Sequence, residues 1–250
     1  MSSRFTDEAY LREQQYRDDS NLRARIELHR RFSTDEQPWH RWVFERLDFP
    51  ADAQILEMGC GPAELWFQNL DRIPKGWTLT LADLSPGMVD EARRALDDRA
   101  EYRVADIQEL PFEDGSVDGV IANHMLYHVA DRPRAFREVA RVLRPEGRFY
   151  CSTNGSDHLK EIKALYVQDK PWSWEFRLED AGDELREVFH DVELERRPGS
   201  LEVTEMEPLV AFVHSLDWGR EGFEEEIRAR IESHGSFHAT KVAGLFRCKP

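Results

Sequence analysis

The pattern of apolar and polar positions changes twice along the chain. Residues 7–47 carry apolar side chains at helical spacing among many charges, with a break at 33–35 and a second helix beginning at Pro38. From there to residue 153, short apolar runs alternate with segments of helical periodicity. We expect strands at 54–58, 78–82, 102–105, 117–122 and 148–153.

Helices are expected between these strands. Ser85 is a favourable N-cap, and Pro86 fits the first turn of the helix that follows. Asp131 starts another helix, which Pro145 and Gly147 are expected to end. Strands that alternate with helices predict a parallel sheet covered by helices on both faces.

The pattern after residue 153 is less regular. Two last strands are expected at 192–196 and 241–248. Helices are expected at 159–168, 177–190, 208–217 and 221–233. The loop 171–176 between the first two of these helices is rich in aromatic residues.

Composition and charge narrow the class of partner. The chain has 250 residues, 40% of them hydrophobic, which is enough for one sizeable core. Its net charge of -15 repels phosphate backbones, so no nucleic-acid partner is expected. The arginines at 23, 25, 30 and 31 form the one basic cluster, and their interleaving with Glu27 favours the solvated side of a helix.

Cysteine usage and hydropathy bear on the compartment. Cys60, Cys151 and Cys248 are few, odd in number and widely spaced, which favours a reducing compartment without disulfides. The amino terminus has no apolar segment typical of a signal peptide, and no apolar stretch has the length of a transmembrane helix. We therefore expect a cytoplasmic protein without a membrane partner.

The first strand runs into the turn Gly59-Cys60-Gly61, where a ligand would approach the backbone closely. Parallel sheets bind ligands beyond the carboxyl ends of their strands, so this turn is the expected site. A tight turn that binds nothing would also need glycine. A dinucleotide is disfavoured, because Glu64 stands where G-x-G-x-x-G has its third glycine and Pro62 lacks a backbone N–H.

Two acidic residues follow the next strands at the same edge of the sheet. Asp83 ends the second strand, where a carboxylate can accept hydrogen bonds from both hydroxyls of a ribose. Asp106 follows the third strand and can accept from an adenine amino group, while Ile107 packs on the ring. A helix cap or a surface acid is the plainer alternative for Asp83.

Five segments between residues 50 and 153 follow one another in the order of the motifs of a class I S-adenosylmethionine-dependent methyltransferase, and they resemble those of its small-molecule type. Residues 55–63 resemble that family's glycine motif, and 81–85 its ribose motif. The adenine motif, the fourth strand and the turn into the fifth strand are matched by residues 105–112, 117–123 and 141–149. The resemblance covers about residues 50–153.

The resemblance implies a fold. We expect one α/β domain over 1–250 with a Rossmann-like, seven-stranded, mostly parallel sheet, helices on both faces and an N-terminal helical lid. Within that domain the lid would span 1–48 and the cofactor-binding core 50–153. The remaining residues, 154–250, would supply substrate-cap helices and the last strands.

The resemblance also implies S-adenosyl-L-methionine as cofactor, with S-adenosyl-L-homocysteine as product. Glu57 would order the glycine loop and receive the methionine ammonium, and Asp83 would bind the ribose hydroxyls. The full set of expected cofactor residues is Glu57, Gly59, Gly61, Asp83, Leu84, Met88, Asp106, Ile107 and Asn123. Ala63 replaces the family's usual third glycine, a small change unless the backbone φ is positive there.

Residues past the fourth strand would face the methyl group in such an enzyme. His124 and His128 are candidate general bases, and Tyr127 is a candidate donor to the substrate. Alternatively, the two histidines only cap or pack one face of a turn. No carboxylate or cysteine partner is evident for a metal site at His124-x-x-x-His128, so no metal is expected.

Aromatic residues of the outer helices are candidates for the substrate lid. Tyr16, Trp39 and Trp172 would pass over the ligand edge and exclude water, or simply pack the cap onto the sheet. The expected reaction is in-line methyl transfer to a small molecule by a monomer or a homodimer. Methylation of tRNA or protein, a binding module without catalysis, and an NAD-linked oxidoreductase are the competing readings.

Overall fold

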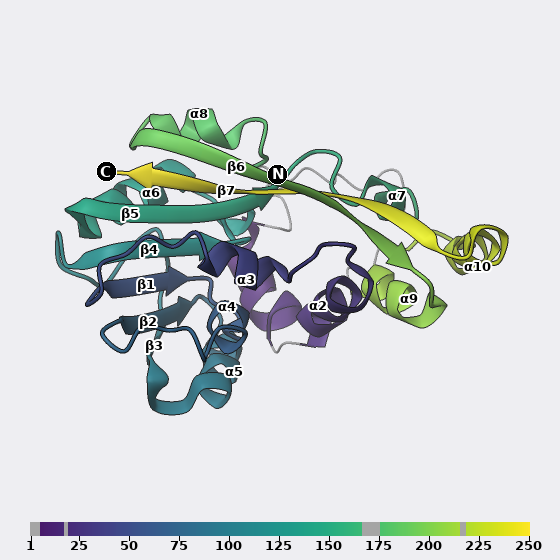
Figure 1. The fold of residues 1–250 in the computed structure, drawn as a ribbon, viewed down its shortest axis with the longest axis horizontal. Helices are drawn as coiled ribbons and strands as arrows, with labels where there is room; N and C mark the ends of the chain where they lie inside the picture. The colour runs from purple at the N-terminus through teal and green to yellow at the C-terminus, as the bar shows by residue number, and fades with distance from the viewer. Residues whose placement is uncertain (1–5, 18–19, 167–175, 216–218) are drawn as a thin grey trace.

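One seven-stranded sheet organises the computed structural model, which describes residues 6–17, 20–166, 176–215 and 219–250. The strand order is β3-β2-β1-β4-β5-β7-β6 (Figure 1). The first five strands run parallel, and β7 pairs antiparallel with both β5 and β6. The strands are β1 (Gln54–Met58), β2 (Thr78–Asp83), β3 (Glu101–Val104), β4 (Val117–Asn123), β5 (Leu143–Asn154), β6 (His190–Val203) and β7 (Phe237–Lys249).

Helices cover both faces of this sheet. Ile55 and other alternate strand residues pack against α3 (Trp39–Phe44), α4 (Glu64–Phe67) and α5 (Pro86–Leu96). Leu56 and Met58 point to the opposite face, where α6 (Arg132–Val142) and α8 (Ala181–Arg186) cover them. Burial on both faces explains why β1 and β4 are nearly continuous apolar runs. The predicted Rossmann-like α/β fold is confirmed.

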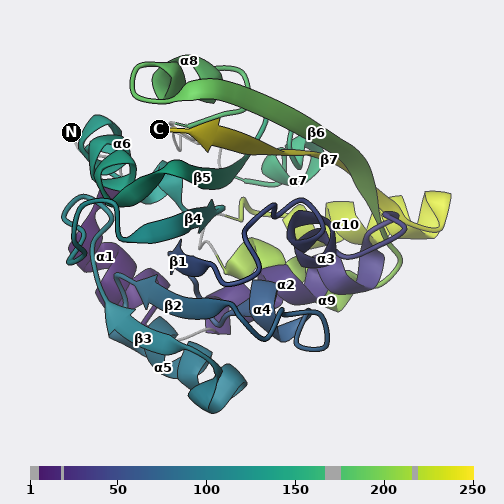
Figure 2. The same ribbon diagram turned by 60° about the vertical axis from the view of Figure 1, so that its left-hand side comes forward.

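A separate apolar cluster forms beyond the end of the sheet. There the distal halves of β6 and β7 extend past the other strands (Figure 1). They bury Leu201 and Phe237 among α2 (Ser20–Phe32), α7 (Lys160–Lys163), α9 (Met206–His214) and α10 (Phe223–His234). Figure 2 shows α2 beside α9. This cluster therefore attaches the N-terminal helices to the carboxyl-terminal part of the chain.

Short helices complete the described chain. The N-terminal region begins with α1 (Glu8–Tyr10) and a π-helix, η2 (Leu11–Gln15). Two 3₁₀ turns follow later, η3 (Asp97–Arg99) and η4 (Leu126–His128). Among the described helices, none combines the length and the apolar character that crossing a bilayer requires.

Several predicted boundaries were wrong, chiefly near the carboxyl terminus. The strand predicted at 192–196 extends to Val203, because Pro198 and Gly199 lie within β6 rather than ending it. Proline is tolerated there since β6 is the edge strand of the sheet. The predicted stop at 145–147 lies inside β5, where an irregular register with β4 accommodates it. Of the helix predicted at 159–168, residues 167–168 lie outside the described residues, and the described part forms the short helix α7. The helix predicted at 177–190 is confined to α8.

Candidate functional site

A cavity of about 980 Å³ opens where the strand order reverses between β1 and β4. The carboxyl ends of β1, β2 and β4 line one side of it, and residues of α2 and α3 line another. Ligand cavities of up to about 1,000 Å³ are common in enzymes, so this one has room for a cofactor and a small substrate together. Its position is the one expected for ligands of open parallel sheets.

The glycine turn after β1 forms the floor of the cavity. Gly59 has φ +66° and Gly61 has φ +53°, both in the left-handed region that favours glycine. A Cβ at Gly59 would lie 2.7 Å from Cβ and Cγ of Met125, closer than packing allows. Both glycines are therefore needed by the turn itself, and both line the cavity.

Ala63 adopts the left-handed conformation as well, with φ 62° and ψ 33°. An L-residue there costs roughly 1–2 kcal/mol. Because φ is positive here, alanine is strained at a position where glycine would not be.

A pair of substitutions at Ala63 tests this strain. Glycine relieves the strain but loses a buried methyl and gains unfolded-state entropy, so Ala63→Gly is expected to change the free energy of unfolding by less than about 1 kcal/mol. Ala63→Val puts a β-branched side chain into the same buried, left-handed position, and a loss of about 3 kcal/mol is expected. Urea unfolding measures the free energy of unfolding of both variants. A well-tolerated valine would contradict the left-handed conformation.

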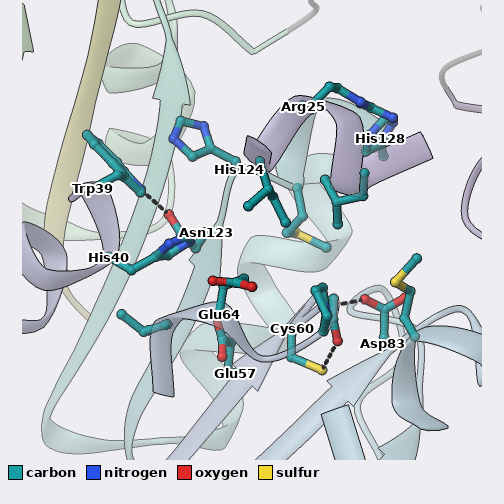
Figure 3. Close-up of a pocket in the computed structure, with 18 of the residues that line it drawn as sticks. Arg25, Trp39, His40, Glu57, Cys60, Glu64, Asp83, Asn123, His124 and His128 are labelled. Carbon is teal, nitrogen blue, oxygen red and sulfur yellow. Dashed lines mark hydrogen bonds between the residues drawn. The ribbon is translucent and has the colours of Figure 1, made fainter. Parts of the chain in front are cut away.

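Asp83 links the glycine turn to the next helix. Its Oδ2 accepts a hydrogen bond from the Gly61 N–H at 3.0 Å, and its Oδ1 accepts from the Ser85 N–H at 2.9 Å. Burial raises the pKa of its carboxyl. Leu84 and Met88 line the cavity beside it. The predicted register between Asp83 and the glycine turn is therefore present, with the carboxylate facing the cavity (Figure 3).

Glu57 is a buried carboxyl at the end of β1. Its Oε2 accepts a hydrogen bond from the Trp66 indole N–H at 2.6 Å. Burial, with a smaller contribution from the nearby Asp83 charge, raises its pKa to about 8. The group is therefore largely protonated at neutral pH. A cation placed beside it would stabilise the ionised carboxylate.

This raised pKa predicts a pH-dependent stability. The unfolded-state pKa of glutamate is about 4.3, so the folded protein holds more protons between about pH 4.5 and 8. The contribution of Glu57 is then fully present below about pH 4.5 and is lost as the pH rises toward 8, by at most about 1.4 kcal/mol per pH unit. The free energy of unfolding of Glu57→Gln should increase relative to wild type over this window. A pH-independent difference would contradict the assignment.

The residues after β3 also reach the cavity. Asp106 Oδ1 accepts from the Gln108 N–H at 2.9 Å, and both its carboxylate oxygens accept from the Gln108 side-chain amide. Ile107 is buried and lines the cavity next to it. A polar acceptor and an apolar surface thus stand side by side, as a heterocyclic base would require.

Two aromatic side chains of the N-terminal helices enter the cavity. The Trp39 indole N–H donates to Asn123 Oδ1 at 3.1 Å, at the end of β4 (Figure 3). The Tyr16 hydroxyl lies 2.9 Å from His128 Nε2, and the two rings meet edge to face. Trp172, the third expected lid residue, lies outside the described residues. Tyr16 and Trp39 therefore contact residues at the end of β4 or just after it.

The two histidines after β4 occupy different environments. His124 has φ 52°, and its buried Nδ1 has no hydrogen-bond partner among the described residues. Burial lowers its pKa to about 3, so its imidazole stays neutral and is a weak base at neutral pH. His128 is bonded to Tyr16 instead. Tyr127 between them is buried, which raises the pKa of its phenol.

Sequence reasoning missed several cavity residues. Arg25 was assigned to a solvated helix face, but it lines the cavity (Figure 3). His40 lines it too, and burial lowers its pKa to about 4. No signal in the sequence showed which arginines of α2 line the cavity, because that depends on how α2 packs against α9. Trp66 does not line the cavity but is bonded to Glu57, and its place just after the glycine turn could have suggested such a role.

Comparison with known proteins gives a consistent picture. Residues 56–151 match the family model described as a methyltransferase domain. A malonyl-[acyl-carrier protein] O-methyltransferase of Methylovorus sp. is 32% identical over 216 residues, which cover 76% of this chain and 73% of that protein.

Other matches are shorter or more distant in sequence. The Streptomyces halstedii methyltransferase GfsG is 35% identical over 42% of this chain, and the match spans only 39% of its own length. The solved Haemonchus contortus phosphoethanolamine N-methyltransferase 2, in complex with phosphomonomethylethanolamine and S-adenosylhomocysteine, superposes with a TM-score of 0.63 at 20% identity. That match covers 100% of this chain and 60% of that one, and at this identity it supports the fold alone.

Proposed function

The chain belongs to the class I S-adenosylmethionine-dependent methyltransferases, and we propose that it transfers the methyl group of S-adenosylmethionine to a small-molecule acceptor by in-line displacement. One observation carries the proposal. The left-handed glycine turn after β1 and the Asp83 carboxylate at the end of β2 are joined by a hydrogen bond and face one cavity. That arrangement suits a nucleoside whose ribose hydroxyls need a carboxylate acceptor.

The lining residues fit the rest of the cofactor. Asp106 and Ile107 would hold the adenine, and Leu84 and Met88 would pack beside the nucleoside. Glu57 would receive the methionine ammonium, and the cation would draw its raised pKa back down. Asn123 lies at the end of β4 beside the glycine turn and would complete the site.

S-adenosylmethionine supplies a methyl group that is already activated on a sulfonium. What remains for the chain is to align the acceptor atom and to exclude water, and we assign the exclusion of water to Tyr16 and Trp39. His124 is too weak a base to deprotonate an acceptor at neutral pH. An acceptor atom that is already ionised or carries a free lone pair is therefore favoured. We propose that His124 and Tyr127 contact the acceptor and that His128 takes up any proton released.

The chemical class of the acceptor is part of the proposal. The relative from Methylovorus carries a name that implies O-methylation of a carboxylate on an acyl carrier protein, and such an acceptor needs no general base. The negative net charge weighs against tRNA as the acceptor. Three buried cysteines without a disulfide, Cys60, Cys151 and Cys248, are consistent with a cytoplasmic site of action.

Release of S-adenosylhomocysteine tests the proposal directly. Purified protein is incubated with S-adenosylmethionine and one acceptor class at a time, namely short-chain dicarboxylates free or on acyl carrier protein, small amines, phenols and unmodified tRNA. We expect turnover with a small-molecule or carrier-bound acceptor and none with tRNA. Methylated tRNA would instead favour a methyltransferase that acts on tRNA. Tight cofactor binding without any turnover would favour a protein that binds the adenosyl ligand without catalysis.

A further inference from the structure

The positive charges around the cavity are not equivalent. Five cationic side chains line it, and four of them have a carboxylate partner. Those pairs are Arg12 with Glu13, Arg30 with Glu27, Arg41 with Asp71 and Lys241 with Asp35. Within the described ranges, Arg25 is the lining cation without an ion pair. In a chain with a net charge of -15, an unneutralised guanidinium inside a cavity is unexpected.

The Arg25 side chain is held in place, but one of its N–H groups lacks a hydrogen-bond acceptor among the described residues. Its Nε donates to the Asn21 carbonyl at 3.2 Å, and its guanidinium lies 5.6 Å from the centre of the Tyr16 ring. Nη2 is buried and has no hydrogen-bond acceptor among the described residues. A buried charged donor left without an acceptor is destabilising, because its lost hydration is not replaced. Such a donor is explained if a ligand supplies the missing acceptor.

The position of Arg25 indicates which ligand. In Figure 3, Arg25 and His128 lie across the cavity from Glu57, Cys60 and Asp83. Tyr16 joins Arg25 to His128, since its ring faces the guanidinium and its hydroxyl contacts the imidazole. Arg25 therefore stands on the side where the acceptor would enter, rather than at the edge of the sheet that would hold the cofactor.

We propose that the methyl acceptor carries an oxyanion, a carboxylate or a phosphate, and that Arg25 binds it through Nη2. The inference rests on the proposed function and names the substrate class of the same cavity. A planar guanidinium presents parallel N–H donors that match both kinds of oxyanion. Tyr16 and His128 add a hydroxyl and a ring nitrogen beside it. Arg25 is thus a binding residue that orients the acceptor.

The methionine carboxylate of the cofactor is the competing occupant. It belongs to the same ligand as the ammonium assigned to Glu57, which lies on the far side of the cavity from Arg25 (Figure 3). The two occupants differ in a measurable way. S-adenosylhomocysteine carries the carboxylate, whereas 5′-methylthioadenosine lacks the whole amino-acid part. If Arg25 bound the cofactor, its removal would weaken only the first of these ligands.

The experiment compares wild type with Arg25→Gln and with the control Arg30→Gln. Arg30 lies on the same helix, but its guanidinium is already bonded to Glu27. Calorimetry gives the affinities for S-adenosylhomocysteine and 5′-methylthioadenosine. Thermal unfolding at constant ionic strength then compares propionate and inorganic phosphate with neutral propionamide, with and without S-adenosylhomocysteine.

We expect at least one of the two anions to stabilise wild type and Arg30→Gln more than propionamide does, and the larger effect identifies carboxylate or phosphate as the group. In Arg25→Gln this preference should vanish while the affinity for S-adenosylhomocysteine changes less than threefold. Arg25→Lys keeps the positive charge without the paired N–H donors of the guanidinium, and it should retain a weaker preference for the anion. This variant provides the test if Arg25→Gln does not fold.

Three outcomes would overturn the inference. The first is no preference for an anion in wild type, and the second is an equal preference in Arg25→Gln. The third is a tenfold or greater loss of S-adenosylhomocysteine affinity in Arg25→Gln with unchanged affinity for 5′-methylthioadenosine. Failure of the proposed function is distinguishable from all three, because wild type would then not bind S-adenosylhomocysteine at all.

Discussion

Asp83→Ala is expected to weaken the binding of S-adenosylhomocysteine by at least about 100-fold. Each hydrogen bond from a ribose hydroxyl to a carboxylate contributes about 1.5–3 kcal/mol, and two of them would be lost. The substitution also removes the acceptor of the Gly61 N–H, so the glycine turn loses its link to β2. Calorimetric titration measures the loss.

A graded set of variants separates binding from folding. Asp83→Asn keeps one oxygen acceptor without the charge and should lose about tenfold in affinity. Asp90→Ala removes an exposed carboxylate of α5 whose ion pair with Arg93 is on the surface, and should bind like wild type. The assignment of Asp83 fails if Asp83→Ala is folded and binds within threefold of wild type.

Gly59→Ala is expected to damage both stability and binding. The methyl would lie 2.7 Å from Cβ and Cγ of Met125 at a residue with φ +66°. Backbone strain costs about 1–2 kcal/mol, and moving Met125 out of the way costs about 1–3 kcal/mol. Together they are expected to lower the free energy of unfolding by roughly 3 kcal/mol. Since the turn is the floor of the cavity, affinity for S-adenosylhomocysteine should fall by at least about tenfold.

Gly115→Ala is the matched control for backbone strain. Gly115 has φ +58°, but a Cβ there meets nothing within 4 Å. Only the strain of about 1 kcal/mol is then expected, with unchanged cofactor binding. Urea unfolding and calorimetry on both variants distinguish the two contributions. Equal destabilisation of the two variants would show that Met125 yields without cost.

The parts of the fold that sequence reasoning found are those with local signals. Strands β1 and β4 are short apolar runs bounded by glycine or polar residues, and their burial on both faces gives a continuous pattern. Asp83 and the glycine turn could be placed at one edge of the sheet because parallel strands share their carboxyl edge. The observed hydrogen bond between Asp83 and Gly61 agrees with that reasoning.

The features that were missed depend on distant contacts. Nothing local shows that β6 continues through Pro198, since only its place at the edge of the sheet makes proline acceptable. Arg25 resembles its neighbouring arginines in sequence, and only the packing of α2 turns it inward. The weak basicity of His124 follows from burial, which the spacing of two histidines does not reveal.

The most direct test of the account is calorimetric titration of the wild-type protein with S-adenosylmethionine, S-adenosylhomocysteine and NAD. The hydrogen bond between Asp83 and the glycine turn supports a nucleoside site, and Glu64 and Pro62 disfavour a pyrophosphate. We predict that both adenosyl ligands bind in the micromolar range and that NAD does not. Absence of binding by both adenosyl ligands would contradict the proposed function and leave only the fold.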